Sequence, residues 1–349
     1  MMQPTPHSGY HWNGKQQPFF EGWYYRLTLP PHQGSVAFMY SLQDPPISPA
    51  GTKTPASGGA VQILGPNEQY FCRSLPDISR FWAWKHRLGH GHSRIGPWAE
   101  GYRVTATSHR GQFWDPVAAR RISWDYTVTP VYGWGAPHQP QSTAGWLSRF
   151  QIFEPGWQIL MAHGWATGWF EWSDAAQKQR FDFEQAPAYA EKNWGGAFPQ
   201  RWFWLQCNAF EHSGDLTLTA GGGIRQVLGW EESVGMVGIH HRGQFYEFVP
   251  WNGTISWQVS PWGRWRIWAE QPNYAVELVG YTESPGVRVR VPTAAGLKFL
   301  CRDTTQGQLS IKLWQKQMRS RQLILSAQSH QAGLEVGGKG WSRGWQHFS

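Results

Sequence analysis

Short segments of alternating apolar and polar residues recur along almost the whole chain, and each is bounded by Gly, Pro, Asn, Asp or Ser. Because residues two apart in a strand share a face, this pattern is typical of half-buried β-strands. The 25 Trp residues favour strands, whereas the 40 Gly and 24 Pro residues favour turns. We therefore predict an all-β fold with many hairpins and one short helix, at residues 77–84.

The 349 residues are enough for one large domain or two ordinary ones, with a buried core and a ligand pocket. The most polar connection near the middle of the chain lies at residues 173–180. We therefore expect two halves, residues 1–180 and residues 181–349, with the boundary at the end of this connection. No sequence repeat relates them, so the periodicity by itself indicates only that both are built from β-strands.

The formal net charge of +8 indicates attraction to polyanionic surfaces. The basic residues are dispersed, whereas nucleic-acid-binding proteins concentrate theirs along a groove, so we expect no nucleic-acid partner. The odd number and wide spacing of Cys72, Cys207 and Cys301 argue against a disulfide framework and favour a reducing compartment. We find neither a targeting peptide nor an apolar run of membrane-spanning length, and expect a soluble or peripheral protein.

Two stripes of polar and aromatic residues near the middle of the chain carry groups that can transfer protons. In an extended strand, alternate residues project to the same side. One stripe consists of His163, Trp165 and Trp169, and the other of Tyr189, Glu191 and Asn193. If both stripes face inward, they line one cavity. The alternative is structural: Glu191 would form a buried ion pair with an arginine, and His163 would only hydrogen-bond to the backbone.

Further polar residues accompany aromatic ones elsewhere. Trp204 and Asn208 share a strand face, where an indole and an amide could position a ring and its hydroxyl groups; a sugar-binding sheet has a similar pattern. Near the N-terminus, the carboxylates Glu21 and Asp44 are secondary acid candidates. Their alternative role is to accept hydrogen bonds from turn amides.

A cluster of histidines could suggest a metal site, but the pattern is incomplete. His86, His90 and His92 lie close together in a loop rich in Gly and Arg, and the pair His240-His241 adds a second hint. The sequence offers no predictable fourth ligand, so we expect no metal. It also contains no GxSxG, Walker A or GxGxxG motif, which removes the usual support for serine hydrolase, nucleotide and dinucleotide functions.

Several longer motifs occur in order along nearly the whole chain. They include TPHSGYHW at residues 5–12, FFEGWYYR at residues 19–26, SVAFMYSLQDP at residues 35–45 and GLEVGGKGW at residues 333–341. These stretches resemble tocopherol cyclases, which close the chroman ring of vitamin E on a prenylated benzoquinol. The resemblance implies two lipocalin-like, or calycin-like, antiparallel β-barrel halves packed together, related to carotenoid hydratases.

The resemblance also implies a reaction. A carboxylic acid protonates the alkene of the prenyl tail, and the neighbouring phenolic oxygen captures the resulting tertiary cation. Because this ring closure involves no redox change, we expect an enzyme of the intramolecular lyase or isomerase type without a cofactor. The acid must stay protonated near neutral pH, which an apolar pocket favours.

The resemblance assigns roles to the two stripes. The pattern His-x-Trp, then Tyr-x-acid-x-Asn-Trp-Gly, is similar to that of carotenoid hydratases, in which the acidic residue is an Asp that protonates a double bond. Glu191 occupies that position and is the expected acid. His163 or Tyr189 would position its proton or receive the phenolic one, and Trp165 would lie beside the cation. The expected substrate contacts are Asn193, Trp169, Trp204, Asn208, Trp23 and Tyr40.

Two other functions are compatible with these residues. In a hydratase-like enzyme, water would capture the same cation on a carotenoid-like substrate; a noncatalytic protein would only carry a lipid or a sugar. The expected partners are a prenylated benzoquinol and an anionic membrane surface, bound peripherally. We expect a cytoplasmic protein on the thylakoid or inner membranes of a bacterium, specifically a cyanobacterium, or in a plastid if this is a mature plant form. The sequence does not specify an oligomeric state.

Overall fold

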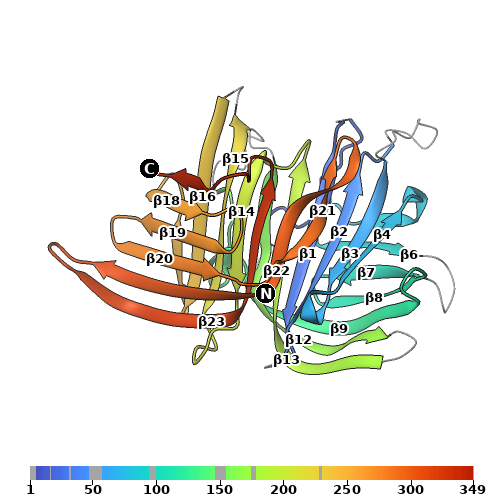
Figure 1. Ribbon diagram of the computed structural model, residues 1–349, viewed down its shortest axis with the longest axis horizontal. Coiled ribbons are helices and arrows are strands. Elements are labelled where there is room, and N and C mark those ends of the chain that lie inside the picture. The colour runs from blue at the N-terminus through green and yellow to red at the C-terminus, as the bar shows by residue number, and fades with distance from the viewer. Residues whose placement is uncertain are drawn as a thin grey trace.

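Two large antiparallel β-sheets lie side by side and account for most of the protein (Figure 1). The computed structural model describes residues 5–15, 17–30, 33–46, 57–93, 100–145, 155–173, 178–227 and 230–348. The all-β prediction is confirmed. The helix predicted at residues 77–84 is wrong, because only a single 3-10 turn, η2 (Ile78–Arg80), forms there before strand β5. A second such turn is η1 (Pro66–Glu68).

The first sheet has eleven strands in the order β4-β3-β2-β1-β13-β12-β9-β8-β7-β6-β5. Their bounds are β1 Phe20–Thr28, β2 Ser35–Gln43, β3 Gly58–Leu64, β4 Tyr70–Leu75, β5 Phe81–Ala83, β6 Gly89–Ser93, β7 Gly101–Thr105, β8 Ser108–Asp115, β9 Arg120–Tyr132, β12 Gly156–Ser173 and β13 Lys178–Gly195. A separate small hairpin pairs β10 (Gly135–Ala136) with β11 (Gln139–Pro140). Residue 180, where we expected the boundary, lies near the start of β13, which belongs to this first sheet.

The second sheet begins with β14, directly after β13 in the sequence. Its strand order is β17-β16-β15-β14-β23-β22-β20-β19-β18-β24, and β21 pairs with β22 beside this path. The strand bounds are β14 Arg201–Cys207, β15 Thr217–Val227, β16 Trp230–His241, β17 Gln244–Phe248, β18 Thr254–Val259, β19 Arg264–Glu270, β20 Tyr274–Tyr281, β21 Val287–Thr293, β22 Gly296–Lys316, β23 Arg321–Gly338 and β24 Trp345–His347. Antiparallel neighbours connected by short turns explain why the alternating pattern is so regular.

Strand β1 divides its side chains between two environments. Trp23 and Leu27 point into the core of the first sheet, whereas Tyr24 packs in a separate apolar cluster that includes Trp204 of the second sheet. Strand β14 does the same, because Phe203 lies in the core of the second sheet and Trp204 faces the first. The alternation therefore gives each sheet its own core and leaves a third cluster between them.

Aromatic and imidazole rings fill the core of the first sheet. The Tyr25 hydroxyl lies 2.9 Å from His90 Nε2, and the Tyr40 hydroxyl lies 2.5 Å from His109 Nε2. Burial lowers the pKa of both histidines well below its usual range, so each is a neutral partner in a buried hydrogen bond. These rings belong to the packed interior of the sheet.

A buried arginine connects the two sheets. Arg26 of β1 donates hydrogen bonds to Gln206 Oε1 on β14 at 2.9 Å and to the Thr305 carbonyl on β22 at 3.1 Å. It also donates to the carbonyl of Gln331 on β23. Because its five donors form a rigid fork, one guanidinium can satisfy acceptors from several strands at once. Arg26 therefore fixes how the first sheet packs on the second.

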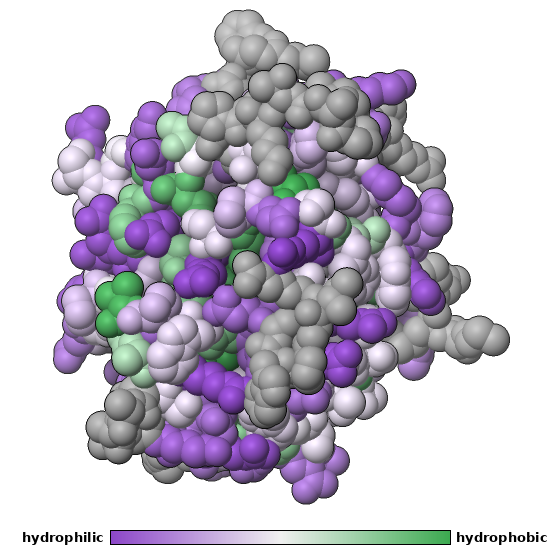
Figure 2. All heavy atoms as spheres, turned by 90° about the vertical axis from the view of Figure 1, so that its right-hand side faces the viewer, coloured by the Kyte–Doolittle hydropathy of each residue, from purple (hydrophilic) through white to green (hydrophobic). Residues whose placement is uncertain are grey.

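The outer surface on the side of the first sheet is mostly hydrophilic. Figure 2 shows this face, where apolar residues form only small, scattered groups among polar ones. Isolated exposed apolar residues of this kind are normal for folded proteins. In the part of the chain that the structure describes, no helix is long and apolar enough to cross a membrane.

Candidate active site

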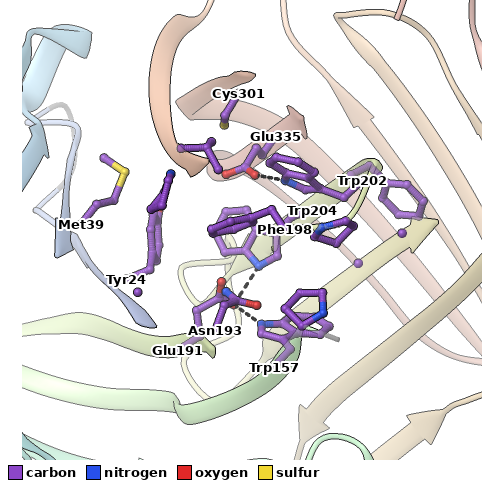
Figure 3. A pocket seen from close by; sticks show the side chains of 18 of the residues that line it. Tyr24, Met39, Trp157, Glu191, Asn193, Phe198, Trp202, Trp204, Cys301 and Glu335 are labelled. Atoms are coloured by element: carbon purple, nitrogen blue, oxygen red, sulfur yellow. Dashed lines mark hydrogen bonds between the residues drawn. The ribbon is translucent and has the colours of Figure 1, made fainter. Parts of the chain in front are cut away.

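A cavity lies between the two sheets and is lined by strands from both (Figure 3). Its volume is about 240 Å³, on a measure by which one water molecule needs about 10 to 15 Å³. Most of its wall is aromatic or apolar. The larger ring-bearing residues that line it are Tyr24, Trp157, Phe198, Trp202, Phe203 and Trp204. An apolar cavity with a few polar groups is typical of a ligand site.

The register of the two sheets brings two rows of side chains face to face across the cavity. In the first sheet, Tyr24 pairs with Glu191 on one side and with Met39 on the other. In the second sheet, Trp204 pairs with Glu335. All five residues line the cavity. Ladder register, rather than any local motif, thus places two glutamates in the same cavity.

A run of three glycines makes room for one wall. Residues 221–223 lie on β15 and all line the cavity. A Cβ atom added at Gly221 would approach the ring of Trp157 to 3.1 Å, which is closer than ordinary van der Waals contact. The missing side chain therefore lets the indole of Trp157 cross from the first sheet and face the cavity.

Glu191 accepts three hydrogen bonds, and all three end on the same carboxyl oxygen. The donors to Oε2 are the Tyr189 hydroxyl at 2.6 Å, Trp157 Nε1 at 3.0 Å and Trp204 Nε1 at 3.1 Å. Because Oε2 already accepts three hydrogen bonds, the proton of the neutral form belongs on Oε1. Figure 3 shows the carboxyl group of Glu191 at the cavity wall between these indoles.

Burial sets the protonation of this acid. It raises the pKa of Glu191 to about 7, against the hydrogen bonds from Tyr189 and Trp157, which favour the charged form. Near neutral pH a large fraction of the molecules therefore carries a neutral Glu191. Its hydrogen-bond donors are uncharged groups, whereas the structural alternative predicted an ion pair with an arginine.

The cavity brings together part of the predicted site, both catalytic residues and substrate contacts. Glu191, Asn193 and Trp204 line it, and Tyr189 lies behind Glu191 as the hydroxyl donor. Two others border the cavity but point their rings away from it. They are Trp23, stacked 4.2 Å from the ring of His90, and Tyr40, stacked 4.0 Å from the ring of Tyr102, both in the core of the first sheet.

The predicted stripe on β12 does not reach this cavity. His163 is buried, and its ring packs 4.5 Å from that of Trp165. The register of β12 against β13 shifts twice between Ile159 and Gly164, so the simple alternation that placed these residues beside Glu191 does not hold. Burial lowers the pKa of His163 to about 4, which makes it a neutral side chain. Trp169 lies under the guanidinium of Arg180.

The remaining predicted residues hold strands together. Asn208 donates to the Ala188 carbonyl at 3.0 Å. Asp44 accepts a hydrogen bond from the Phe19 amide at 2.8 Å. Glu21, which is fully buried, pairs with the ammonium group of Lys192. None of the three carboxyl or amide side chains is among the residues that line the cavity.

The histidines that suggested a metal are engaged separately. His90 bonds to Tyr25 in the first core, and His92 Nε2 lies 2.9 Å from the Asp77 carbonyl. His240 Nε2 lies 2.8 Å from the Gly135 carbonyl. Within the described ranges, no three His, Cys, Asp or Glu side chains are grouped so that they could hold a metal ion.

Several cavity residues were not singled out from the sequence. Tyr24 lies in the motif at residues 19–26, on the strand face opposite that of Glu21 and Trp23, the two residues of this motif that the sequence suggested for the site. Glu335 lies within the motif at residues 333–341, as a lone carboxylate among apolar residues and glycines. A lone acidic residue within such a segment is a usable signal, because unpaired carboxylates are rarely buried without a function.

Comparisons with known proteins place the chain in a family. The sequence model of the family described as tocopherol cyclase-like matches residues 17–338. A probable chloroplastic tocopherol cyclase of Oryza sativa subsp. japonica is 41% identical over 380 aligned positions, which cover 98% of this chain and 80% of the rice protein. The chloroplastic tocopherol cyclase of Zea mays is also 41% identical, over 98% of this chain and 79% of the maize protein.

Solved structures share the fold at low sequence identity. CghA, in a crystal structure with Sch210972, has a TM-score of 0.52 and 9% identity, with 97% of this chain and 96% of CghA covered. Kievitone hydratase from Nectria haematococca has a TM-score of 0.52 and 11% identity, with 97% of each chain covered. These similarities agree with the predicted lipocalin-like architecture of two packed antiparallel halves.

Proposed function

The chain belongs to the tocopherol cyclase-like family, and we propose that it closes the chroman ring of a tocopherol on a phytyl or other prenyl benzoquinol. The observation that carries this proposal is Glu191, a buried carboxyl group whose pKa is raised to about 7 within an aromatic cavity. Such a group can give a proton to carbon near neutral pH, which an ordinary exposed glutamate does poorly.

The chemistry has two bond-forming steps. The π electrons of the tail alkene take the proton from Glu191 Oε1, so that a C–H bond forms and a tertiary cation remains. A lone pair of the phenolic oxygen then forms the C–O bond, and the phenolic proton leaves. Product and substrate are isomers, so the reaction is balanced without an oxidant or a reductant. We therefore extend the proposal to a cofactor-independent enzyme of the intramolecular lyase or isomerase type.

The aromatic walls supply only part of the rate enhancement. A cation–π contact contributes about 0.5 to 2 kcal/mol. Contacts with two rings, such as those of Trp157 and Trp204, therefore lower the activation free energy by much less than the roughly 8 kcal/mol at the lower end for enzymes. Holding the oxygen and the alkene in a reactive geometry is worth about 7 to 11 kcal/mol at best. In this proposal the folded tail is thus mainly oriented, and secondarily stabilised as a cation.

The same proposal includes a place of action. A net charge of +8 and a lipid substrate favour peripheral binding to an anionic membrane. This membrane would be a thylakoid or inner membrane facing the cytoplasm of a bacterium such as a cyanobacterium, or a plastid membrane. The second setting is supported by the plant relatives, both of which are named chloroplastic.

Product analysis tests the function directly. Purified protein is incubated with a prenyl benzoquinol under reducing conditions, with and without a strong chelator, and the products are separated on a chiral column. We expect a single chromanol enantiomer, formed equally well with the chelator. A hydrated tail would instead identify a hydratase, and quinol recovered unchanged after prolonged incubation would identify a carrier. Activity restored only by a metal would overturn the cofactor assignment.

A further inference from the structure

A pair of carboxyl groups, Glu335 and Asp303, lies on the side of the cavity opposite Glu191. Figure 3 shows Glu191 and Glu335 on facing walls, with the indole of Trp204 between them and that of Trp202 beside Glu335. Glu335 of β23 lines the cavity and pairs across the ladder with Asp303 of β22. Residues directly opposite in such a ladder project to the same face, so the two carboxyl groups are neighbours.

These two carboxyl groups have few hydrogen-bond partners: Cys301 interacts with Glu335, and the Thr304 backbone favours the charged form of Asp303. Glu335 Oε1 accepts a hydrogen bond from Trp202 Nε1. Asp303 is only 1% exposed, and neither of its carboxyl oxygens has a partner in the described part of the chain. Burial raises the pKa of both groups, and the neighbouring Glu335 charge raises that of Asp303 further. Two adjacent buried carboxylates repel each other, so ionisation of one opposes ionisation of the other, while the charge of Arg26 favours the charged form of Asp303.

An unpartnered hydroxyl completes this polar wall. The Tyr24 hydroxyl is buried and, among the described residues, has no hydrogen-bond partner. Burial raises its pKa well above the usual range, and the charges of Asp303 and Glu335 act in the same direction, against that of Arg26. Tyr24 and Glu335 both line the cavity. Buried polar groups are normally hydrogen-bonded. The Tyr24 hydroxyl and the Asp303–Glu335 pair thus form a site that a ligand with hydroxyl groups would satisfy.

We propose that Glu335, with Asp303 beside it, is the base that accepts the phenolic proton, and that the quinol ring therefore lies against the β22–β23 wall. This inference rests on the proposed function. In the second step, the phenolic oxygen forms the C–O bond, its O–H bond breaks, and the proton passes to the ionised carboxylate of the pair. Glu191 is then an anion and the pair is neutral; exchange with solvent restores both.

The positions of the two groups suit separate roles. The backbone of Trp204 pairs with that of Glu335, and its indole N–H donates to Glu191. The length of one tryptophan side chain therefore separates the acid from the base. A proton and an oxygen delivered from opposite walls add to opposite faces of the alkene. The arrangement therefore predicts anti addition, with the new C–H and C–O bonds on opposite sides of the former double bond.

The test compares two matched variants in deuterated water. In Glu335→Gln the Trp202 hydrogen bond is kept, but the base is lost. We expect chromanol formation to fall by about 100-fold or more, while the alkene is still protonated, so that deuterium enters recovered quinol and double-bond isomers. Glu335→Asp should recover part of the ring closure. The control Glu247→Gln changes a glutamate that also accepts an indole N–H, from Trp134 at 2.8 Å, but lies outside the cavity lining, and should cyclise normally.

Three results would overturn the assignment. The first is wild-type turnover in Glu335→Gln. The second is the loss of both deuterium uptake and ring closure with quinol binding retained, which would make Glu335 part of the acid. The third is syn addition in the wild-type product, read by NMR from the relative configuration of deuterium and oxygen. Because this measurement uses the wild-type protein, it tests the position of the base even if Glu335→Gln does not fold. A wild-type protein that forms no chromanol would instead refute the proposed function itself.

Discussion

At the scale of single residues, two opposing effects act on the Glu191 carboxyl group. Burial favours its neutral form, and hydrogen bonds from Tyr189, Trp157 and Trp204 favour the charged form. Burial is the larger effect, so the pKa rises to about 7 instead of falling. The donors then limit the rise, which keeps the proton available for transfer. A carboxyl group with a much higher pKa would be a weaker acid toward carbon.

Removing one of these donors should shift the pH dependence in a defined direction. Trp157→Phe deletes an N–H group that stabilises the charged form, so the pKa of Glu191 rises further. The acid form then persists to higher pH. We expect the fall of kcat/KM at high pH to move upward by about one pH unit relative to the wild type. A fall of kcat/KM that stays at the same pH or moves to lower pH would contradict this description of the acid.

The sequence singled out Glu191, the proposed acid, but not the opposite wall of the cavity, for a physical reason. Glu191 and Tyr189 lie two apart on β13, whose pairing with β1 is unbroken there, so alternation decides which way each side chain points. His163 lies within the register shift between Met161 and Gly164, where that rule fails. Glu335 and Asp303 meet only because β22 and β23 pair, and their separation along the chain hides that contact from any local pattern.

At the scale of secondary-structure elements, a buried ion pair ties β1 to β13. Glu21 and Lys192 are both fully buried, and the Lys192 ammonium also donates to the Gly9 carbonyl at 2.6 Å. The His11 amide donates to Glu21 Oε2 at 2.8 Å. Burial alone would raise the pKa of Glu21, but the charge of Lys192 and the contacts with His11 lower it overall, so this carboxylate stays ionised. Its part is to hold the N-terminal segment and two strands together.

Breaking this pair should cost stability. Glu21→Gln leaves the Lys192 ammonium buried without its counter-charge, and such changes destabilise a protein by about 3 to 5 kcal/mol. Lys192→Met combined with Glu21→Gln removes both charges and should lose less than the single change. Denaturant unfolding measures the difference. A Glu21→Gln protein as stable as the wild type would refute the ion-pair role. So would a double variant less stable than the Glu21→Gln protein.

The strands themselves were the most predictable elements. Alternation and turn residues indicated hairpins throughout, and the strands agree with that pattern because antiparallel neighbours need only short connections. The expected helix at residues 77–84 failed because its few residues form one 3-10 turn and then pair as β5 with β6. A single turn of helix is stable only with tertiary support, so a weak local pattern is a poor guide to it.

At the scale of the whole molecule, the cavity exists because two sheets with separate cores pack face to face. Each sheet supplies one wall, with Glu191 from the first and Glu335 from the second, and Arg26 fixes their contact. The strand pattern could indicate neither the packing of the sheets nor the cavity, because both depend on which strands become neighbours. The polar connection at residues 173–180 suggested two halves, but only the likeness to a known family indicated that they are packed β-barrels.

The charge of the molecule predicts how it meets a membrane. With a net charge of +8, the protein should sediment with anionic vesicles at low salt and remain in solution with neutral ones. At about 1 M salt the Debye length shrinks to about 3 Å, and binding should be largely lost. The face in Figure 2 shows no broad apolar patch that would hold it there instead. Absent binding at low salt, or binding unaffected by salt, would argue against electrostatic attachment.

The most direct test of the central claim is the fate of one proton in deuterated water. The Glu191 proton exchanges with solvent before reaction, so the wild-type chromanol should carry one nonexchangeable deuterium on the ring carbon beside the newly oxygenated one. Glu191→Gln keeps the shape of the side chain but has no proton to give; its turnover should fall by about 10² to 10⁴-fold, with quinol binding, followed by tryptophan fluorescence, little changed. Near-normal turnover in Glu191→Gln, or wild-type chromanol without deuterium, would contradict the account.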